Sequence, residues 1–205
     1  MARAWTARAS ERRSTALAAV LALVIPLAAC GEDEPALETL FTVPVFELID
    51  QNGEPFGTAQ LRDRVWIASF LFTSCGASCP TLAAQLGNLQ GRLAVHGDRV
   101  RIVSLTVDPE TDTPERLRAF GERFDADFSR WVFLTGDPGT VREVHEHAFL
   151  QPEATRTELD VAPGYDVFHG TAVLLFDTQL RCRGIYRMDR VGHDTLVRDV
   201  GRLLE

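Results

Sequence analysis

The sequence predicts an α/β domain in which a central, mostly parallel sheet carries helices on both faces. Three apolar runs, at residues 65–72, 100–107 and 171–176, have the length and continuity of strands buried on both faces. Segments with helical spacing of apolar residues alternate with these runs, as expected when crossover helices join parallel strands. Two cysteines, Cys75 and Cys79, follow the first run directly. Sites in such sheets gather at the carboxyl ends of the strands, so both cysteines lie where a site is expected.

An N-terminal hairpin is predicted to extend the sheet. Residues 41–50 alternate in the manner of a strand, residues 50–54 carry a turn signal, and the chain returns from Pro55. One helical turn is expected at residues 59–63, before the first buried strand. After the cysteines, leucines at helical spacing predict a helix over residues 81–96.

The second half of the chain continues the alternation of helices and strands. Thr113 is expected to cap a helix whose first position is Pro114, and Asp137 to cap the next one. The polar residues 150–166 predict an exposed excursion. The other predicted elements are a strand at 131–134, a helix at 140–148, an antiparallel return strand at 182–186 and a terminal helix at 194–204.

Composition and charge limit the function classes. The chain has 205 residues, 45% of them hydrophobic and 24% charged, which is an ordinary globular balance. Its formal net charge is −8, whereas a nucleic-acid binder needs a basic face. We therefore expect no nucleic-acid partner and one domain, at residues 41–205, behind a leader.

The leader has the layout of an export signal. Residues 1–29 join an arginine-rich start to a short apolar core that ends in small residues. A membrane-spanning anchor is the less favoured alternative, because the run is short and contains Pro26. The segment before Cys30, Leu-Ala-Ala, resembles the bacterial lipobox, so we expect Cys30 to be lipidated and residues 30–40 to form an acidic tether. These features predict a membrane-anchored lipoprotein on the extracytoplasmic, periplasmic side.

Cys75 and Cys79 are four positions apart where a strand gives way to a helix. If the intervening residues are helical, the two side chains share one face, about 5–6 Å apart between Cβ atoms. A helix N-terminus favours thiolates, because its free amides and dipole stabilise negative charge. The pair can close on one soft metal ion, form a redox-active disulfide, or form a permanent structural disulfide.

A two-thiolate copper site needs a further ligand, and the chain holds five histidines. His96 and His193 border the ends of predicted elements, where solvation is expected. His145 and His147 are two apart on a predicted helix, so they do not share a face, and surface positions are favoured for both. His169 precedes a buried strand, where a lone histidine is more often structural.

Three segments together resemble the Sco (SenC) family of thioredoxin-like copper proteins. They are the Phe-Leu-Phe-Thr-Ser-Cys-Gly-Ala-Ser-Cys-Pro-Thr run at 70–81, the Ser-Leu-Thr-Val-Asp-Pro-Glu-Thr-Asp-Thr-Pro run at 104–114, and Tyr-Asp-Val-Phe-His-Gly-Thr at 165–171. In order and spacing they cover residues 41–205. The resemblance implies a thioredoxin-like fold in which Cys75, Cys79 and His169 bind one copper ion, Cu(I) or Cu(II).

The resemblance also implies a role in building the binuclear copper centre of cytochrome c oxidase. The expected partners are the copper-bearing subunit of that oxidase, a copper donor chaperone and the membrane that holds the lipid anchor. Gly76 stands where the family often has proline, which removes no ligand. Asp108 ends the neighbouring strand and is either a second-shell group near the sulfurs or a turn cap. Cys182 is expected to be a packed or incidental free thiol.

Three other functions use the same features. A membrane-anchored thiol–disulfide oxidoreductase would use Cys75 and Cys79 to reduce the copper-site cysteines of the oxidase. A peroxidase is less favoured, since the proline and threonine arrangement expected before a peroxiredoxin nucleophile is lacking. A purely structural lipoprotein is the remaining alternative.

Overall fold

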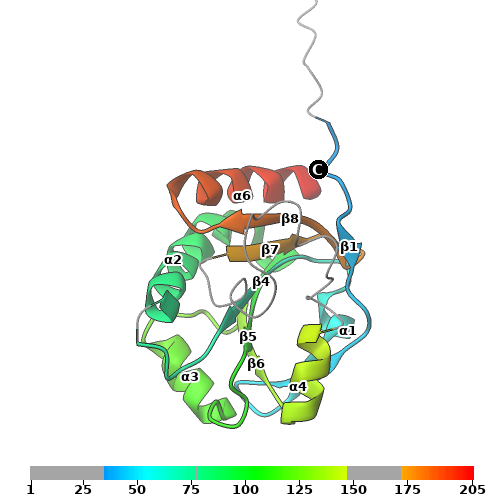
Figure 1. Ribbon diagram of the computed structural model, residues 1–205. Coiled ribbons are helices and arrows are strands. Elements are labelled where there is room, and N and C mark those ends of the chain that lie inside the picture. The colour runs from blue at the N-terminus through cyan, green and yellow to red at the C-terminus, as the bar shows by residue number, and fades with distance from the viewer. Residues whose placement is uncertain (1–34, 77, 147–171) are drawn as a thin grey trace, which may run out of the picture. The chain divides into compact units, whose positions relative to one another are not determined.

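The computed structural model describes residues 35–76, 78–146 and 172–205, and its folded unit runs from Ala36 to Glu205 (Figure 1). Within these ranges the strands form one sheet in the order β1-β8-β7-β4-β5-β6-β2-β3. The strands are β1 (Phe41–Thr42), β2 (Glu47–Asp50), β3 (Pro55–Gly57), β4 (Val65–Leu71), β5 (Val100–Thr106), β6 (Trp131–Thr135), β7 (Ala172–Phe176) and β8 (Arg181–Arg187). The helices are α1 (Thr58–Leu61), α2 (Ser78–Leu93), the 3₁₀ helix η1 (Ala94–Arg99), α3 (Pro114–Glu122), α4 (Pro138–Val144) and α6 (Arg190–Leu203).

The expectation of a mostly parallel sheet is wrong in this detail. β4 pairs in parallel with β5, and β5 with β6, but every other described pairing is antiparallel. A strand buried on both faces has the same residue pattern in either direction, so the apolar run of β7 could not reveal that it runs antiparallel to β4. The turn that joins β7 to β8 confirms the predicted antiparallel return.

Helices cover both faces of the sheet, as predicted (Figure 1). Alternate residues of the fully buried β4 supply the two cores: Val65, Ile67 and Leu71 face one way, whereas Trp66 and Phe70 face the other. The first set packs with apolar residues of α2, α3 and α6, and the second packs with residues of α1 and α4. Burying a large apolar side chain contributes about 1.5–3 kcal/mol, so these two layers hold β4 in place. They also fix the start of the loop between β4 and α2, residues 72–77, which we call the cysteine loop.

The helix caps agree with the sequence at two of the predicted positions. The side chain of Thr113 accepts from the Arg116 amide and begins α3, and that of Asp137 accepts from the Thr140 amide and begins α4. The terminal helix α6 begins earlier than predicted, because Asp189 caps it.

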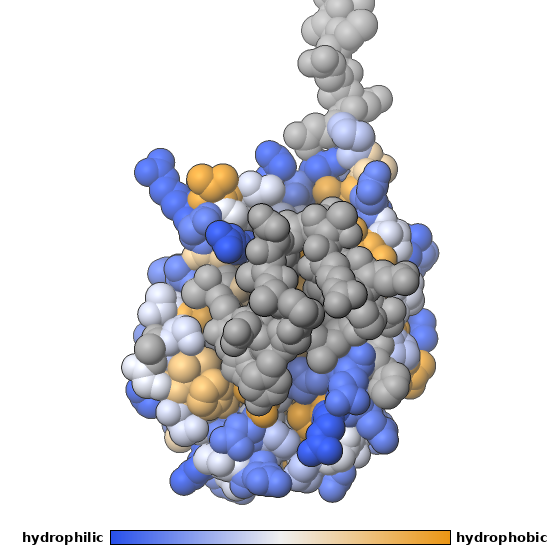
Figure 2. Space-filling model, viewed as in Figure 1, coloured by the Kyte–Doolittle hydropathy of each residue, from blue (hydrophilic) through white to orange (hydrophobic). Residues whose placement is uncertain are grey.

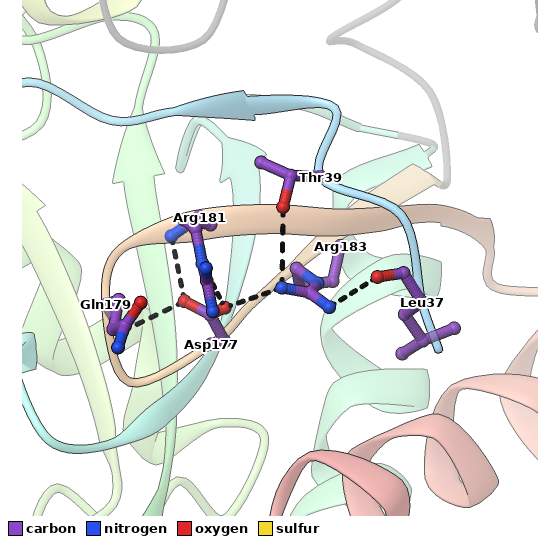
Figure 3. Close-up of polar contacts among 6 residues, drawn as sticks. All are labelled: Leu37, Thr39, Asp177, Gln179, Arg181 and Arg183. Atoms are coloured by element: carbon purple, nitrogen blue, oxygen red, sulfur yellow. Dashed lines mark hydrogen bonds and ion pairs between the residues drawn. The ribbon is translucent and has the colours of Figure 1, made fainter. Parts of the chain in front are cut away.

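The segment before β1 is attached to β8 (Figure 3). Arg183 donates to the carbonyl of Leu37 and, at 3.4 Å, to the hydroxyl of Thr39. Arg183 also pairs at 3.0 Å with the buried carboxylate of Asp177, which Arg181 contacts at 2.7 Å. These residues of the predicted tether therefore lie against the sheet, although the predicted domain boundaries themselves stay a prediction.

The predicted strand at residues 41–50 is two strands at different places in the sheet. β1 pairs with β8 at one edge, and β2 pairs with β6 near the other. β2 and β3 form the predicted N-terminal hairpin. Pro44 lies between β1 and β2, and proline interrupts a strand because it lacks an amide donor.

The described surface has no single large apolar patch among its most exposed hydrophobic residues. Val45, Val95 and Val191 lie before β2, in η1 and in α6, respectively. Figure 2 likewise shows hydrophobic residues scattered among hydrophilic ones on the face drawn. None of the described helices has the length and hydropathy of a membrane span.

Candidate metal centre

The two cysteines lie on either side of a helix start rather than together on a helix. β4 ends at Leu71, the chain turns, and α2 begins only at Ser78. Cys79 is therefore in the first turn of α2 with 3% of its surface exposed, whereas Cys75 is half-buried in the preceding loop. The condition for a helical i, i+4 pair is not met, because the helix begins three residues after Cys75.

Hydrogen bonds bring the two cysteines together instead. The amide of Cys79 donates to Sγ of Cys75 at 3.3 Å, and Oγ of Ser78 lies 3.5 Å from the same sulfur. First-turn amides of a helix have no partner within the helix, so the Cys75 sulfur serves as a capping acceptor. Both cysteines are free thiols. The local structure thus holds two sulfur atoms close together without a disulfide bond between them.

The sequence predicts that the helix start favours thiolates, but this effect does not prevail at Cys79. Burial raises the pKa of the Cys79 thiol to about 11, although the hydrogen bond with the backbone of Phe72 lowers it. At this position, the free-energy cost of removing a thiolate from water exceeds the stabilisation that the helix N-terminus provides. Cys79 therefore keeps its proton at neutral pH, and a metal ion bound there has to displace it.

A buried carboxylate that the sequence pattern did not single out attaches the cysteine loop to the sheet. Asp112 accepts from the amide of Thr73 at 3.1 Å and from its hydroxyl at 2.5 Å. Its other oxygen accepts from the hydroxyl of Thr106 at 2.5 Å. We call Thr73, Thr106 and Asp112 the Asp112 clamp. A sequence signal exists, since Asp112 lies in the 104–114 motif together with Asp108.

Asp108 builds the turn after β5 through its main chain. Its amide donates to the hydroxyl of Thr106 at 3.0 Å, and its carbonyl accepts from the amides of Thr111 and Asp112. These contacts match the turn-cap alternative. The second-shell role for its carboxylate stays a prediction.

The sequence favours a surface position for His145, but the structure places it partly inside the domain. It follows α4 half-buried, with Nε2 2.9 Å from the carbonyl of Thr106 and its ring 5.1 Å from that of Phe70. The apolar side of α4 turns it inward, toward the end of β5. His193 is half-buried too, with Nδ1 2.6 Å from Arg92, and burial and Arg92 lower its pKa. His96 is half-buried in η1.

Some predicted site residues lie outside the described part of the chain. They are Cys30, His147 and His169. Among the described residues, no group of three or more histidine, cysteine or acidic side chains could hold a metal ion. The described structure thus supplies two of the three predicted ligands. Cys182 is a buried free thiol in β8, as predicted, and its Sγ lies 3.7 Å from the carbonyl of Gly184.

The direction of β7 determines which end of the sheet the chain reaches just after His169. In the register of β4 and β7, Trp66 is opposite Phe176 and Ala68 is opposite Leu174. The chain therefore enters β7 at the end of the sheet where β4 leaves for the cysteine loop. A parallel β7 would have begun at the other end.

Comparisons with known proteins agree with this architecture. The family model described as SCO1/SenC matches residues 35–205. A structure of a SCO1/SenC family lipoprotein from Bacillus anthracis has a TM-score of 0.70 and 29% identity, over 83% of this chain and 100% of the other. The structure of BsSco, described as having a disulfide switch and as a member of the Sco family of cytochrome c oxidase assembly proteins, has a TM-score of 0.66 and 25% identity, over 81% of this chain and 95% of the other. The predicted thioredoxin-like α/β fold is confirmed.

Two curated relatives align over shorter stretches. The SCO1 protein homolog of Bacillus subtilis is 36% identical over 54% of this chain and 57% of its own length. A protein of Stutzerimonas stutzeri, described as a candidate copper-binding protein, is 33% identical over 71% of this chain and 69% of its own. The match thus spans little more than half of the Bacillus subtilis protein. With the family model covering the whole folded unit, this chain belongs to the SCO1/SenC family.

Proposed function

We propose that this protein is an extracytoplasmic copper metallochaperone that binds one copper ion and assists assembly of the binuclear copper centre of cytochrome c oxidase. The observation that carries the proposal is the pair of free thiols at the start of α2, with the Cys79 amide on the Cys75 sulfur. Soft thiolates suit Cu(I), and imidazole suits both copper states. The descriptions of the Stutzerimonas stutzeri relative and of BsSco support the metal and the process, respectively.

The proposed ligands are Cys75, Cys79 and His169. The two cysteines fit a copper ion because they are adjacent, unbridged and of the right softness. The support for His169 is indirect: it closely precedes β7, and the chain enters β7 at the cysteine end of the sheet. When bound, copper would be cargo that this pair of sulfurs takes up and releases.

We further propose that the protein acts from the outer face of a membrane. Residues 1–29 would be the export signal, Cys30 the lipidated residue and residues 30–40 the link to the domain. The lipoprotein from Bacillus anthracis supports this arrangement. The copper-bearing subunit of the oxidase would receive the metal, and a donor chaperone would supply it.

A titration with copper(I) tests the proposal. The reduced protein competes with a chromophoric Cu(I) chelator, and we expect one copper ion per chain. Cys79→Ser should abolish competition, while Cys182→Ser, a matched buried thiol outside the site, should not change it. His169→Ala should weaken binding by at least about tenfold, and His96→Ala should not. Failure of the wild-type chain to compete for copper would end the proposal.

The alternative is a thiol–disulfide oxidoreductase acting on the oxidase cysteines. It is favoured by the free dithiol and by the disulfide switch described for BsSco. The two functions separate at His169: a reductase should keep its exchange activity in His169→Ala and lose it in Cys75→Ser. A metallochaperone should bind copper less tightly in both variants.

A further inference from the structure

Asp112 is a fully buried carboxylate with three donors aimed at it. Its exposed fraction is 0%, and its hydrogen bonds in the described structure come from the Thr73 amide and from the hydroxyls of Thr73 and Thr106. Burying a carboxylate is costly unless hydrogen bonds replace its water. Such a group is retained only where the surrounding structure is arranged to satisfy it, so its position has a structural or functional reason.

The clamp joins segments that are distant in the sequence. Thr73 lies in the cysteine loop, Thr106 is the last residue of β5, and Asp112 comes just before the cap of α3. Thr106 also accepts from the Asp108 amide, and its carbonyl lies 2.9 Å from Nε2 of His145 after α4. The cysteine loop is thus attached to a junction of three other elements.

The two sulfurs are held in unequal ways. Cys79 is in α2, whose leucines are buried in the core, so its backbone moves only with the helix. Cys75 lies on the loop, where its amide donates to the Phe72 carbonyl at 3.3 Å. Two positions before Cys75, Thr73 makes the bonds to Asp112. The position of the Cys75 sulfur relative to Cys79 therefore depends on the clamp.

We propose that Asp112 is a positioning residue: through Thr73 it holds the cysteine loop so that the Cys75 sulfur stays beside Cys79 in the dithiol, metal-ready arrangement. The copper-binding test of this proposal rests on the proposed function, whereas the test by thiol–disulfide exchange does not. Groups behind metal ligands commonly change metal affinity by about 10–100-fold when they are altered, because they orient the ligands.

Thiol–disulfide exchange supplies the measurement that needs no copper. In exchange with oxidised glutathione, the Cys75–Cys79 S–S bond forms and the glutathione S–S bond breaks. The two cysteines lose two electrons and two protons, which appear on two molecules of reduced glutathione. Because the clamp is made in the dithiol form, loosening it should favour the disulfide.

The test compares variants of Thr73 in the full chain. Thr73→Val keeps the shape and removes the hydroxyl, while Thr73→Ser keeps the hydroxyl. Ser69→Ala is the control, because Ser69 is fully buried on β4 and its hydroxyl is 2.7 Å from that of Ser104, away from the cysteine loop. Each variant is measured for Cu(I) affinity by chelator competition, for the glutathione equilibrium and for stability in urea.

We expect Thr73→Val to weaken Cu(I) binding at least about tenfold. We also expect it to move the glutathione equilibrium about threefold or more toward the disulfide, as the loss of one hydrogen bond would. Thr73→Ser should restore both values, and Ser69→Ala should lower stability alone. An equilibrium that is unchanged in Thr73→Val, or displaced toward the dithiol, would overturn the proposal. If the wild-type chain binds no copper, the proposed function fails, and the glutathione equilibrium still decides the role of the clamp.

Discussion

Asp112 and Asp177 are both buried carboxylates, with 0% and 5% exposed, at opposite ends of the central sheet. Asp177 follows β7 near the beginning of β4, and its partners include Arg181 and Arg183. Asp112 lies at the end of β4, beside the cysteine loop, and its described partners are hydroxyls and an amide. An aspartate carboxylate is thus satisfied by cationic arginine side chains at one end of the sheet and by neutral donors at the other.

The difference fits the role that we propose for the cysteine end. At the Asp177 end, two guanidinium groups neutralise the carboxylate and attach the N-terminal segment through Arg183 (Figure 3). At the cysteine end, a guanidinium would repel a copper cation at the proposed site, since like charges repel strongly where water is excluded. Neutral donors satisfy Asp112 without that repulsion. We therefore expect Asp177 to affect stability alone and Asp112 to affect both stability and the site.

The largest expected effect is that of Asp177→Ala. Removing one partner of a buried ion pair leaves charge uncompensated, and we expect a loss of about 3–5 kcal/mol of unfolding free energy in urea. Glu122→Ala is the control, because its pair with Arg118 is exposed and should contribute less than about 1 kcal/mol. The folded fraction of Asp177→Ala should bind Cu(I) as the wild type does. A weakened copper affinity there would contradict the contrast between the two ends.

Asp112→Ala should lower the unfolding free energy less than Asp177→Ala does, but it should also disturb the proposed copper site. The main loss is the acceptor of the Thr73 amide, since hydroxyls can turn to other partners, and an unsatisfied buried group costs about 1–3 kcal/mol. Unlike Asp177→Ala, this variant should also bind Cu(I) less tightly. Urea unfolding and chelator competition on the same preparation measure the two effects. Unaltered copper affinity in the folded variant would make the two carboxylates equivalent.

The acid dependence of stability should come partly from Asp177. Burial alone would raise the pKa of Asp177, but hydrogen bonds from the amide and guanidinium of Arg181 outweigh burial and hold that pKa below its ordinary value. The unfolded state therefore binds the proton first as the pH falls from about 4, and this contribution is lost as the pH passes through the lower folded pKa.

Asp177→Asn should remove that contribution. The slope of unfolding free energy against pH below about pH 4 should become shallower, by at most about 1.4 kcal/mol per pH unit for one proton. Urea titrations between pH 2 and 5 measure it. An equal slope in both proteins would mean that the folded carboxyl is not stabilised by its arginine neighbours.

Cys182→Ser should have the smallest effect. Cys182 is fully buried in β8 beside Arg183, and its thiol makes a weak contact at 3.7 Å with the Gly184 carbonyl. We expect a loss of about 1 kcal/mol, typical of a conservative core change, and an unchanged glutathione equilibrium. A shifted equilibrium would place this thiol in exchange with Cys75 or Cys79.

Local patterns predicted most of the elements. The continuous apolar run of β4, the leucine spacing of α2 and the caps Thr113 and Asp137 all appear as expected, because each depends on neighbours in the sequence. The start of α2 was less predictable. Small polar residues suit both a helix start and a loop, and α2 begins at Ser78, three residues before the predicted start at residue 81.

Some features of the site were likewise predictable from local sequence, whereas others were not. Motif and spacing were enough to identify the family, the two cysteines and their place after β4. The antiparallel direction of β7, and the position of Asp112 and His145 at the cysteine end, became known from the folded domain. Burial in that domain also keeps the proton on Cys79. Strand direction, desolvation and contacts between distant segments arise from the packed arrangement of the whole domain, and local patterning contains none of them.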